Sequence, residues 1–313
     1  MKLFITGGTG FVGRALTKRL AQEGYEITIL TRGDRRDQYS IQGVSFIEGD
    51  STKKGDWQAL LMDYDVIINL AGASIFRRWT KKTKKAITDS RIFTTENLVE
   101  GLMGRKSSGA LLISTSAVGY YGFHGDEELS ESSPSGTDFL ASVSREWESA
   151  AKKAEKYGAR VVICRLGIVL GKEGGALKQM IPLYKWYMGG RLGSGRQWFS
   201  WIHQEDLVEI YLFLIRNKDI FGPVNCTSPN PVRNKDMTEI MGRVLKRPIL
   251  MPAVPGFMIR LFMGEFGDTL IKGQRVLPEK LSEAGFKFRF PELQHALEYI
   301  IRKDDPSNKR HGT

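Results

Sequence analysis

Short apolar runs alternate with longer stretches of helical periodicity along the first half of the chain. Between the first two runs, Val12, Leu16 and Leu20 recur at helical spacing and form one apolar face. Several runs are apolar at successive positions, which is typical of parallel strands buried between two layers of helices. The pattern therefore predicts an α/β fold with a doubly wound parallel sheet. The predicted strands are Lys2–Thr6, Glu26–Leu30, Val44–Ile47, Val66–Leu70, Ala110–Ser114 and Arg160–Leu166, with long helices over Lys81–Met103 and Phe139–Tyr157.

The pattern changes after about Gly171, where glycine, proline and tryptophan become frequent. This region does not continue the alternation of strand and helix, so we predict a second, smaller C-terminal domain. The sheet domain is predicted over residues 1–175, and the smaller domain over residues 176–204 and 228–303. Residues 304–313 have no apolar periodicity and are predicted to form a frayed tail.

The composition is that of an ordinary globular protein. Of 313 residues, 41% are hydrophobic and 26% are charged, which excludes the disordered, collagen-like and disulfide-rich classes. Cys164 lies inside an apolar run where a buried thiol is expected, so a reducing, cytoplasmic location is favoured. No stretch approaches the ~18 apolar residues that span a bilayer, and the N-terminus lacks the layout of a signal peptide, so no membrane partner is expected. The few histidines and cysteines are too widely separated to suggest a metal site.

The charge balance favours an anionic ligand. Lysine and arginine number 46 against 35 aspartates and glutamates, which gives a formal net charge of +11. The basic residues are spread along the chain, and no zinc-finger or aromatic-basic RNA motif occurs, so nucleic acid is not expected as a partner. An anionic small-molecule substrate is the expected partner. The sequence does not indicate the oligomeric state.

A glycine-rich segment, Thr6–Gly13, directly follows the first predicted strand and opens the first predicted helix. In a dinucleotide-binding turn, the glycine at position 7 permits the tight bend, Gly10 lets the backbone approach a pyrophosphate, and Gly13 allows close packing of helix on strand. The helix N-terminus then offers amide donors and a positive dipole to the phosphates. The alternative is a structural turn without a ligand. The predicted cofactor contacts here are Gly7, Thr9, Gly10, Phe11, Val12 and Gly13.

The end of the second strand indicates which dinucleotide would bind. A site selective for NAD usually places an acidic residue there to hold the ribose hydroxyls. This chain has Arg32 at that point, with Arg35 and Arg36 just beyond, and a guanidinium suits the additional 2′-phosphate of NADP. In the alternative, Arg32 only solvates the strand end and Asp34 reaches the ribose. We expect NADP, with NAD as the less favoured cofactor.

Two further loops follow strands at the edge where open α/β sheets bind ligands. Asp50 and Ser51 follow the third strand and are predicted near the adenine, although Asp50 is equally well explained as a helix cap. The loop after the fourth strand is predicted to pass beneath the nicotinamide ribose through Leu70, Ala71 and Gly72. Arg77 and Arg78 begin a run of cations nearby and are candidates to bind a phosphate or an anionic substrate; a solvated helix face is the alternative.

These motifs resemble the extended short-chain dehydrogenase/reductases, the group that contains nucleotide-sugar epimerases and dehydratases. Thr6–Gly13, Asp50 and Asn69–Gly72 match the cofactor signatures of that group, and Ser114–Val118 ends a strand where the family keeps its catalytic Ser or Thr. Further segments are similar to the branch called epimerase family protein, which carries a C-terminal domain of unknown function: Gln197–His203, Ser228–Val232, Gly273–Pro278 and Glu283–Phe286. The match covers nearly the whole chain.

The resemblance implies a Rossmann-type sheet domain that residues 205–227 rejoin, with substrate in the cleft between the two domains. It also implies that Arg165–Gly171 forms the turn after the sixth strand, where Leu166 would contact the cofactor. Enzymes of this group carry a Tyr-x-x-x-Lys pair, because the lysine lowers the tyrosine pKa toward neutrality. Here the expected positions hold Leu140 and Ser144, neither of which can replace that pair.

Other residues must therefore supply the chemistry. Ser116 is a candidate to hydrogen-bond a substrate carbonyl or hydroxyl, with local backbone capping as the alternative. Tyr121, with Tyr120 beside it, is a candidate to overhang the nicotinamide; a packed aromatic pair or pocket wall is the alternative. His203 is as well explained by a structural hydrogen bond as by proton transfer, and Arg275 as well by an interdomain ion pair as by a substrate clamp.

The sequence thus predicts an NADP-binding oxidoreductase or epimerase-like enzyme for a small polar substrate, including nucleotide-linked sugars. Its mechanism would be hydride exchange at nicotinamide C4, with Ser116 and Tyr121 as the catalytic candidates. The alternative is a non-catalytic NADP-binding sensor or scaffold protein, which the residues at positions 140 and 144 support.

Overall fold

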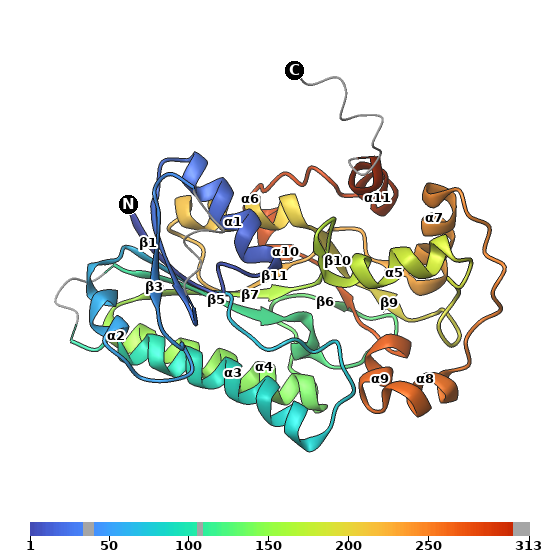
Figure 1. Ribbon diagram of the computed structural model, residues 1–313, viewed down its shortest axis with the longest axis horizontal. Helices are drawn as coiled ribbons and strands as arrows, with labels where there is room; N and C mark the ends of the chain where they lie inside the picture. The colour runs from blue at the N-terminus through green and yellow to red at the C-terminus, as the bar shows by residue number, and fades with distance from the viewer. Residues whose placement is uncertain (34–40, 105–108, 303–313) are drawn as a thin grey trace. The chain divides into compact units, whose positions relative to one another are not determined.

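The computed structural model describes residues 1–33, 41–104 and 109–302 (Figure 1). A seven-stranded sheet has the order β11-β7-β5-β4-β1-β2-β3. The pairs of β1 with β2, β1 with β4, β2 with β3 and β4 with β5 are all parallel. The predicted α/β class with a Rossmann-type, mostly parallel sheet is confirmed. The strands are β1 Lys2–Thr6, β2 Glu26–Thr31, β3 Val44–Glu48, β4 Val66–Asn69, β5 Leu111–Ala117, β7 Arg160–Leu166 and β11 Gly222–Cys226.

The chain forms two compact units. The first comprises residues 1–120, 135–165 and 208–224, and the second comprises residues 121–134, 166–207 and 225–313. The sequence analysis assigned all of residues 1–175 to the sheet domain. The structure instead groups two segments of that range, 121–134 and 166–175, with the second unit. For the first of them, the reason is local bonding: Glu131 Oε1 accepts a hydrogen bond of 2.9 Å from the amide of Asn225, also in that unit.

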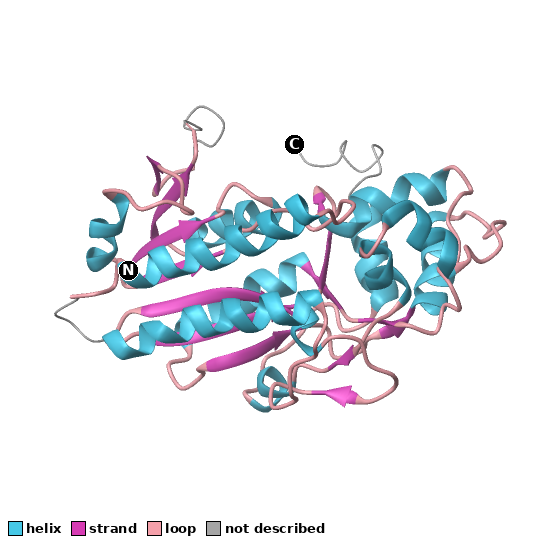
Figure 2. Ribbon diagram, turned by 90° about the horizontal axis from the view of Figure 1, so that it is seen from below, coloured by secondary structure: helices cyan, strands magenta, loops and turns pink. Residues whose placement is uncertain are grey.

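Helices cover both faces of the sheet in the first unit. Figures 1 and 2 show α3 and α4 side by side on one face, and Figure 1 shows α1 on the other. Arg19 of α1 donates to Glu209 of α6 at 2.7 Å, which joins the two helices of the second face. The helices are α1 Phe11–Gln22, α2 Trp57–Leu60, α3 Lys81–Glu100, α4 Phe139–Lys152 and α6 Gln204–Arg216, with short 3₁₀ turns over Leu61–Asp63, Val118–Tyr121 and Lys153–Tyr157.

Apolar side chains between these layers form the core of the first unit. Phe4, Ile67, Leu112 and Ile163, one from each of four strands, are all 0% exposed. Burial of each such side chain contributes about 1.5–3 kcal/mol. The alternating apolar runs of the sequence are therefore the inner strands of the sheet.

The second unit is built from short elements around its own core of Leu170, Trp201, Met237 and Leu297. Three two-stranded ladders occur in it, pairing β8 with β10, β9 with β12 and β6 with β13. Its strands are β6 Glu128–Leu129, β8 Ile168–Gly171, β9 Trp198–Phe199, β10 Trp201–His203, β12 Val232–Arg233 and β13 Arg275–Val276. Its helices are α5 Gly175–Lys185, α7 Asn234–Leu245, α8 Gly256–Met263, α9 Phe266–Ile271, α10 Glu279–Glu283 and α11 Leu293–Arg302.

Candidate functional site

The sheet reverses its strand order at β1. The chain proceeds outward from β1 through β2 to β3 and then crosses to β4 on the other side of β1. Ligands of open α/β sheets bind outside the carboxyl ends of the strands at such a switch point. Two predicted loops lie there: the turn Gly7–Gly10 after β1 and the loop 70–72 after β4.

The glycine turn and the β4 loop are in backbone contact. A Cβ on Gly7, whose φ is +72°, would lie 2.7 Å from the carbonyl carbon of Leu70. A Cβ on Gly13 would lie 2.2 Å from the Gly7 oxygen, so helix α1 starts directly against the turn. Steric exclusion of any side chain therefore accounts for these two glycines without a ligand.

Gly10 is different, because packing does not demand it. It is exposed, and a Cβ there would approach only the Gly7 oxygen, at 3.2 Å. Gly10 is also the N-cap of the twelve-residue helix α1, and no side chain caps that helix N-terminus. The outer side of the turn is thus open for an anion beside uncapped helix amides, which is the arrangement that a pyrophosphate requires.

Asn69 holds the β4 loop in place. Its side chain is fully buried, and its Oδ1 accepts hydrogen bonds from Thr6 Oγ1 at 2.7 Å and from the Ala71 amide at 3.3 Å. Its Nδ2 donates to Thr95 Oγ1 of α3 at 2.9 Å. One amide side chain therefore connects the ends of β1 and β4 to α3 and fixes the backbone of Leu70, Ala71 and Gly72.

Arg32 follows the end of β2 directly and is exposed. Asp50, after β3, accepts hydrogen bonds from the Thr52 amide at 3.0 Å and from Thr52 Oγ1 at 2.7 Å, so its side chain forms a local turn. Burial raises the pKa of Asp50, but the bonds from Thr52 and the charges of Lys53 and Arg32 outweigh it, and the pKa is lowered overall. Asp34, Arg35 and Arg36 lie outside the described residues.

Arg91 of α3 lies beneath the β4 loop and was not found by sequence reasoning. A Cβ on Gly72 would lie 3.3 Å from the guanidinium carbon of Arg91. Its Nη1 donates to the carbonyls of Ala73 at 3.1 Å and Ile87 at 3.0 Å. Burial lowers the pKa of Arg91 to about 10, so it still carries its charge at neutral pH. A desolvated cation beside the predicted cofactor path attracts anions.

A buried charge pair lies at the end of β5. Glu148 of α4 accepts from Arg165 Nε at 2.8 Å and from Arg165 Nη2 at 2.9 Å, and both side chains are at most 3% exposed. Ser116 Oγ donates to the same carboxylate at 2.8 Å and is itself 1% exposed. The ring of Tyr120 covers the Arg165 guanidinium, whose carbon lies 3.5 Å from the ring centroid. The Ser116 hydroxyl is therefore held by a rigid polar network.

Around this network, α4 carries Leu140 and Ser144 one turn apart, both toward its packed side. Arg77 and Arg78 are exposed in the segment before α3. That segment is anchored to the start of α4, because Trp79 packs edge-on against Phe139 with ring centroids 5.2 Å apart. Ser51, by contrast, is bonded to α3, with Ser51 Oγ 3.0 Å from Thr94 Oγ1.

Four other predicted residues lie in the second unit. Tyr121 is fully buried and donates to Asn225 Oδ1 at 2.6 Å, an environment that favours the packed aromatic over the catalytic alternative. His203 Nδ1 accepts from the Glu205 amide at 3.1 Å, as a structural histidine at the start of α6 does. Arg275 Nη2 lies 2.9 Å from Glu128 Oε1, an ion pair within one unit rather than between two. Leu166 ends β7 and is half-buried.

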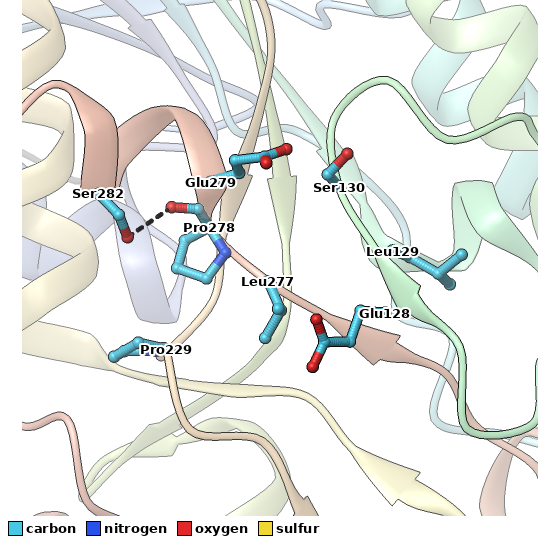
Figure 3. A pocket seen from close by; sticks show the side chains of 8 residues that line it. All are labelled: Glu128, Leu129, Ser130, Pro229, Leu277, Pro278, Glu279 and Ser282. Atoms are coloured by element: carbon cyan, nitrogen blue, oxygen red, sulfur yellow. Dashed lines mark hydrogen bonds between the residues drawn. The ribbon is translucent and has the colours of Figure 1, made fainter.

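The second unit also holds a pocket of about 360 Å³ (Figure 3). The side chains that line it include the carboxylates of Glu128 and Glu279, the hydroxyls of Ser130 and Ser282, and the apolar Leu277. Two carboxylates disfavour an anion, so this pocket does not suit the anionic substrate expected from the sequence. In the described ranges, no cluster of three or more histidine, cysteine, aspartate or glutamate side chains is arranged to hold a metal ion.

Glu148, Arg165 and Arg91 are charged residues near the candidate site that the sequence analysis missed, and the sequence carries a signal for the first two. Glu148 falls on the apolar face of α4 that Val143, Trp147 and Ala151 define, and Arg165 follows the apolar run of β7. A charge on an apolar face needs a buried partner of opposite sign. Glu148 and Arg165 could have been predicted as a buried pair on that ground. Arg91 could not have been predicted as a desolvated cation, because α3 is polar on much of its length.

The sequence matches the family described as "NAD dependent epimerase/dehydratase family" over residues 3–226, and "Domain of unknown function (DUF1731)" over residues 254–300. It is 40% identical over 304 residues to the epimerase family protein SDR39U1 homolog, chloroplastic, of Arabidopsis thaliana, which covers 96% of this chain and 87% of that protein. It is also 40% identical over 303 residues to the epimerase family protein YfhF of Bacillus subtilis (strain 168), covering 96% and 98%.

Among solved structures, the fold matches human epimerase family protein SDR39U1 (isoform2) with NADPH. The TM-score is 0.83 at 30% sequence identity, and the match covers 96% of this chain and 99% of that one. Among the helices described here, none combines the length and the apolar character needed to cross a membrane.

Proposed function

Because the chain belongs to the NAD dependent epimerase/dehydratase family, we propose that it is an NADP-dependent oxidoreductase or epimerase-like enzyme for a small polar, anionic substrate. Nucleotide-linked sugars fall in that class. The family match confirms the resemblance predicted from the sequence. The observation that carries the proposal is the open Gly10 edge beside the uncapped N-terminus of α1, at the switch point of the sheet.

The turn and the β4 loop fit a nicotinamide dinucleotide. The backbone of Thr9–Gly13 would hold the pyrophosphate, Asp50 and Ser51 would lie by the adenine, and the loop 70–72 would support the nicotinamide ribose. Leu166 would contact the nicotinamide end. When bound, such a cofactor supplies hydride exchange at carbon C4 of its nicotinamide ring.

Arg32 is proposed to select NADP. It stands at the strand end where an acidic residue would hold the ribose hydroxyls of NAD, and its exposed side chain would fork onto a 2′-phosphate. The structure of human SDR39U1 with NADPH supports this choice, since that protein is 30% identical over nearly the full chain.

An anionic substrate or the cofactor phosphates would find cations near the β4 loop. Arg91 lies under Gly72, and Arg77 and Arg78 are exposed in the segment that follows the loop. Arg77 would contact the cofactor in this proposal. The charge of Arg91 acts more strongly on a nearby anion than the charges of the exposed arginines, because water screens it less.

Ser116 is proposed to steady the reacting oxygen. Since it donates its proton to Glu148, its oxygen can act only as an acceptor, so it would bind a substrate hydroxyl rather than a carbonyl. Glu148 and Arg165 are then positioning residues. The positions of the usual tyrosine and lysine hold Leu140 and Ser144, which means that proton transfer must use another group. Tyr121 stays a candidate, although its enclosed hydroxyl argues for a structural role.

A second candidate function is a non-catalytic NADP-binding sensor or scaffold. The observation that favours it is the burial of both catalytic candidates, with Ser116 1% and Tyr121 0% exposed. It shares the cofactor site with the enzyme proposal and differs only in turnover.

Two measurements separate these functions. Calorimetry with NADPH and NADH tests the cofactor site, and failure to bind either dinucleotide would overturn both candidates. Purified protein is then incubated with NADPH and a panel of carbonyl and nucleotide-sugar compounds while the absorbance of the reduced nicotinamide is followed. Turnover that Ser116→Ala reduces supports the enzyme, and Tyr121→Phe is compared with Tyr120→Phe as its matched control. Tight NADPH binding without turnover on the panel assigns the sensor function.

A further inference from the structure

Two segments of the second unit, residues 183–193 and 246–263, expose large apolar side chains to solvent. Trp186 is 78% exposed, Phe257 71% and Leu250 68%. Side chains of this size are usually buried, and their accumulation on one surface marks an interaction site. We call this surface the apolar face; its residues are Leu183, Trp186, Tyr187, Met188, Leu250, Met251, Phe257, Met258, Leu261 and Phe262.

Hydrogen bonds join the two segments to each other. Arg247 Nη1 donates to Tyr187 Oη at 3.1 Å, and the Val254 amide donates to the Arg191 carbonyl at 2.8 Å. The Gly193 amide donates back to the Val254 carbonyl at 2.9 Å. The turn after α5 and the chain leading into α8 therefore lie side by side.

Helix α8 contributes one continuous apolar side. Phe257 and Leu261 are four residues apart, as are Met258 and Phe262, so the four side chains share one side of the helix. All four are exposed, whereas Ile259, on the opposite side, is 6% exposed. The exposed side of α8 is thus at least as apolar as the side that packs inward.

The turn that presents Trp186 ends helix α5 in a left-handed cap. Tyr187 has a φ of 58°, which is uncommon for a residue with a large side chain. The Met188 amide donates to the Leu183 carbonyl at 2.7 Å, which closes the turn. The Tyr187 amide also donates to the Tyr184 carbonyl at 3.0 Å, and these two bonds form the left-handed cap with which many helices end. Trp186 therefore stands at the C-terminal end of α5, in a turn whose backbone is bonded to the helix.

The charges of the two segments are all of one sign. They contain five cations and no aspartate or glutamate: Lys185, Arg191, Lys246, Arg247 and Arg260. Arg260 Nε lies 2.7 Å from Asp268 of α9, outside the segments. The apolar face therefore carries exposed tryptophan, phenylalanine and leucine among lysines and arginines. A membrane-surface element has this composition, because its apolar residues enter the acyl boundary and its cations bind anionic headgroups.

We propose that the apolar face binds the surface of an anionic lipid bilayer, with α8 and the Trp186 turn entering the interface. A second copy of the chain fits less well, because a symmetric contact would bring the same cations of both copies together. The sequence expectation of no membrane partner rested on the lack of a spanning segment. Binding in the plane of the interface requires none.

The test is co-sedimentation of the full chain with two kinds of vesicle, pure phosphatidylcholine and an equal mixture of phosphatidylcholine and phosphatidylglycerol. We expect binding to the anionic vesicles only, weakened by salt. Phe257→Ser with Leu261→Ser should weaken it about tenfold or more. Lys185→Glu with Lys246→Glu should weaken it about tenfold. The matched control is Phe221→Ser, which changes a side chain of the first unit that is 67% exposed and should bind like the wild type.

Thermal unfolding of each variant verifies that it is folded, which the exposure of the changed side chains predicts. Absence of binding to anionic vesicles overturns the proposal, as does equal binding by the wild type and the Phe257→Ser, Leu261→Ser variant. Sedimentation velocity supplies the competing outcome. A dimer that this double variant dissociates, without vesicle binding by the wild type, would assign the apolar face to a second copy and reject the lipid surface.

Discussion

Ser116 Oγ donates a hydrogen bond of 2.8 Å to Glu148 Oε1, and the same oxygen accepts 2.8 Å from Arg165 Nε. The hydroxyl that we propose to steady the reacting oxygen is thereby tied to a buried ion pair. A carboxylate in this place cannot lower the pKa of a neighbouring acid as a lysine does. Its consequence is structural: it fixes the rotamer of Ser116 and neutralises Arg165.

Replacing Glu148 by Gln should lower the free energy of unfolding by about 3 kcal/mol. The change leaves the Arg165 guanidinium, 2% exposed, without its carboxylate, and an uncompensated buried charge is strongly destabilising. Urea unfolding measures the effect. The control is Glu146→Gln on the exposed side of the same helix, which should change stability by less than about 0.5 kcal/mol. Equal effects at the two positions would contradict the pair.

Replacing Arg32 by Ser should weaken NADPH binding about tenfold to a hundredfold and leave NADH binding unchanged. The lost interaction is a charge-assisted bond to the 2′-phosphate, which NADH lacks. Isothermal calorimetry with both dinucleotides measures the two affinities. Lys18→Ser, which removes an exposed cation of α1, should affect neither. A similar loss for NADH would show that Arg32 acts elsewhere than on the 2′-phosphate.

Replacing Arg91 by Met should separate binding from stability. Burial lowers the pKa of Arg91 to about 10, which means that the folded chain disfavours its charged form. An apolar side chain of similar length removes that cost together with the bonds to Ala73 and Ile87, so the free energy of unfolding should change by less than about 1 kcal/mol. The NADPH dissociation constant should rise about tenfold. Lys85→Met, at a 74% exposed side chain of α3, is the control for both readouts. A large loss of stability without a change in affinity would make Arg91 a purely structural residue.

Much of the sheet could be predicted from local pattern. β1 over Lys2–Thr6 and β7 over Arg160–Leu166 have the predicted bounds, because both are apolar runs buried on two faces. The glycine turn was predictable for a similar reason: backbone packing at Gly7 and Gly13 excludes every other residue type. A structural feature can therefore be predicted from the sequence where a local constraint, such as burial or close backbone packing, determines the residue type.

What could not be predicted depends on contacts between distant segments. The segment 121–134 looks like part of the sheet domain, yet Glu131 bonds to Asn225, 94 residues away. Arg91 reaches a loop that lies 18 residues earlier in the chain, at Ala73. Neither partner leaves a periodic signal, since a single long-range hydrogen bond changes only one residue at each end.

Glu131 should give the protein a pH-dependent stability that a neutral side chain abolishes. Glu131 is 6% exposed, and burial raises its pKa although the amides of Asn225 and Lys280 donate to it at 2.9 and 3.4 Å. Between the ordinary and the raised pKa, the folded chain holds this proton while the unfolded chain has lost it. Stability from this group is therefore greatest at low pH and falls as pH rises through that window, by up to about 1.4 kcal/mol per pH unit.

Urea unfolding of the wild type and of Glu131→Gln from acid to neutral pH measures the effect. As pH rises, the free energy of unfolding of the wild type should fall relative to that of the variant. The control is Glu283→Gln, which changes an exposed carboxylate of α10. The free energy of unfolding of this variant should depend on pH in the same way as that of the wild type. If the free energy of unfolding of the wild type instead rose relative to that of Glu131→Gln as pH rises, the prediction would be contradicted. The two amides, not burial, would then determine the pKa of this carboxylate.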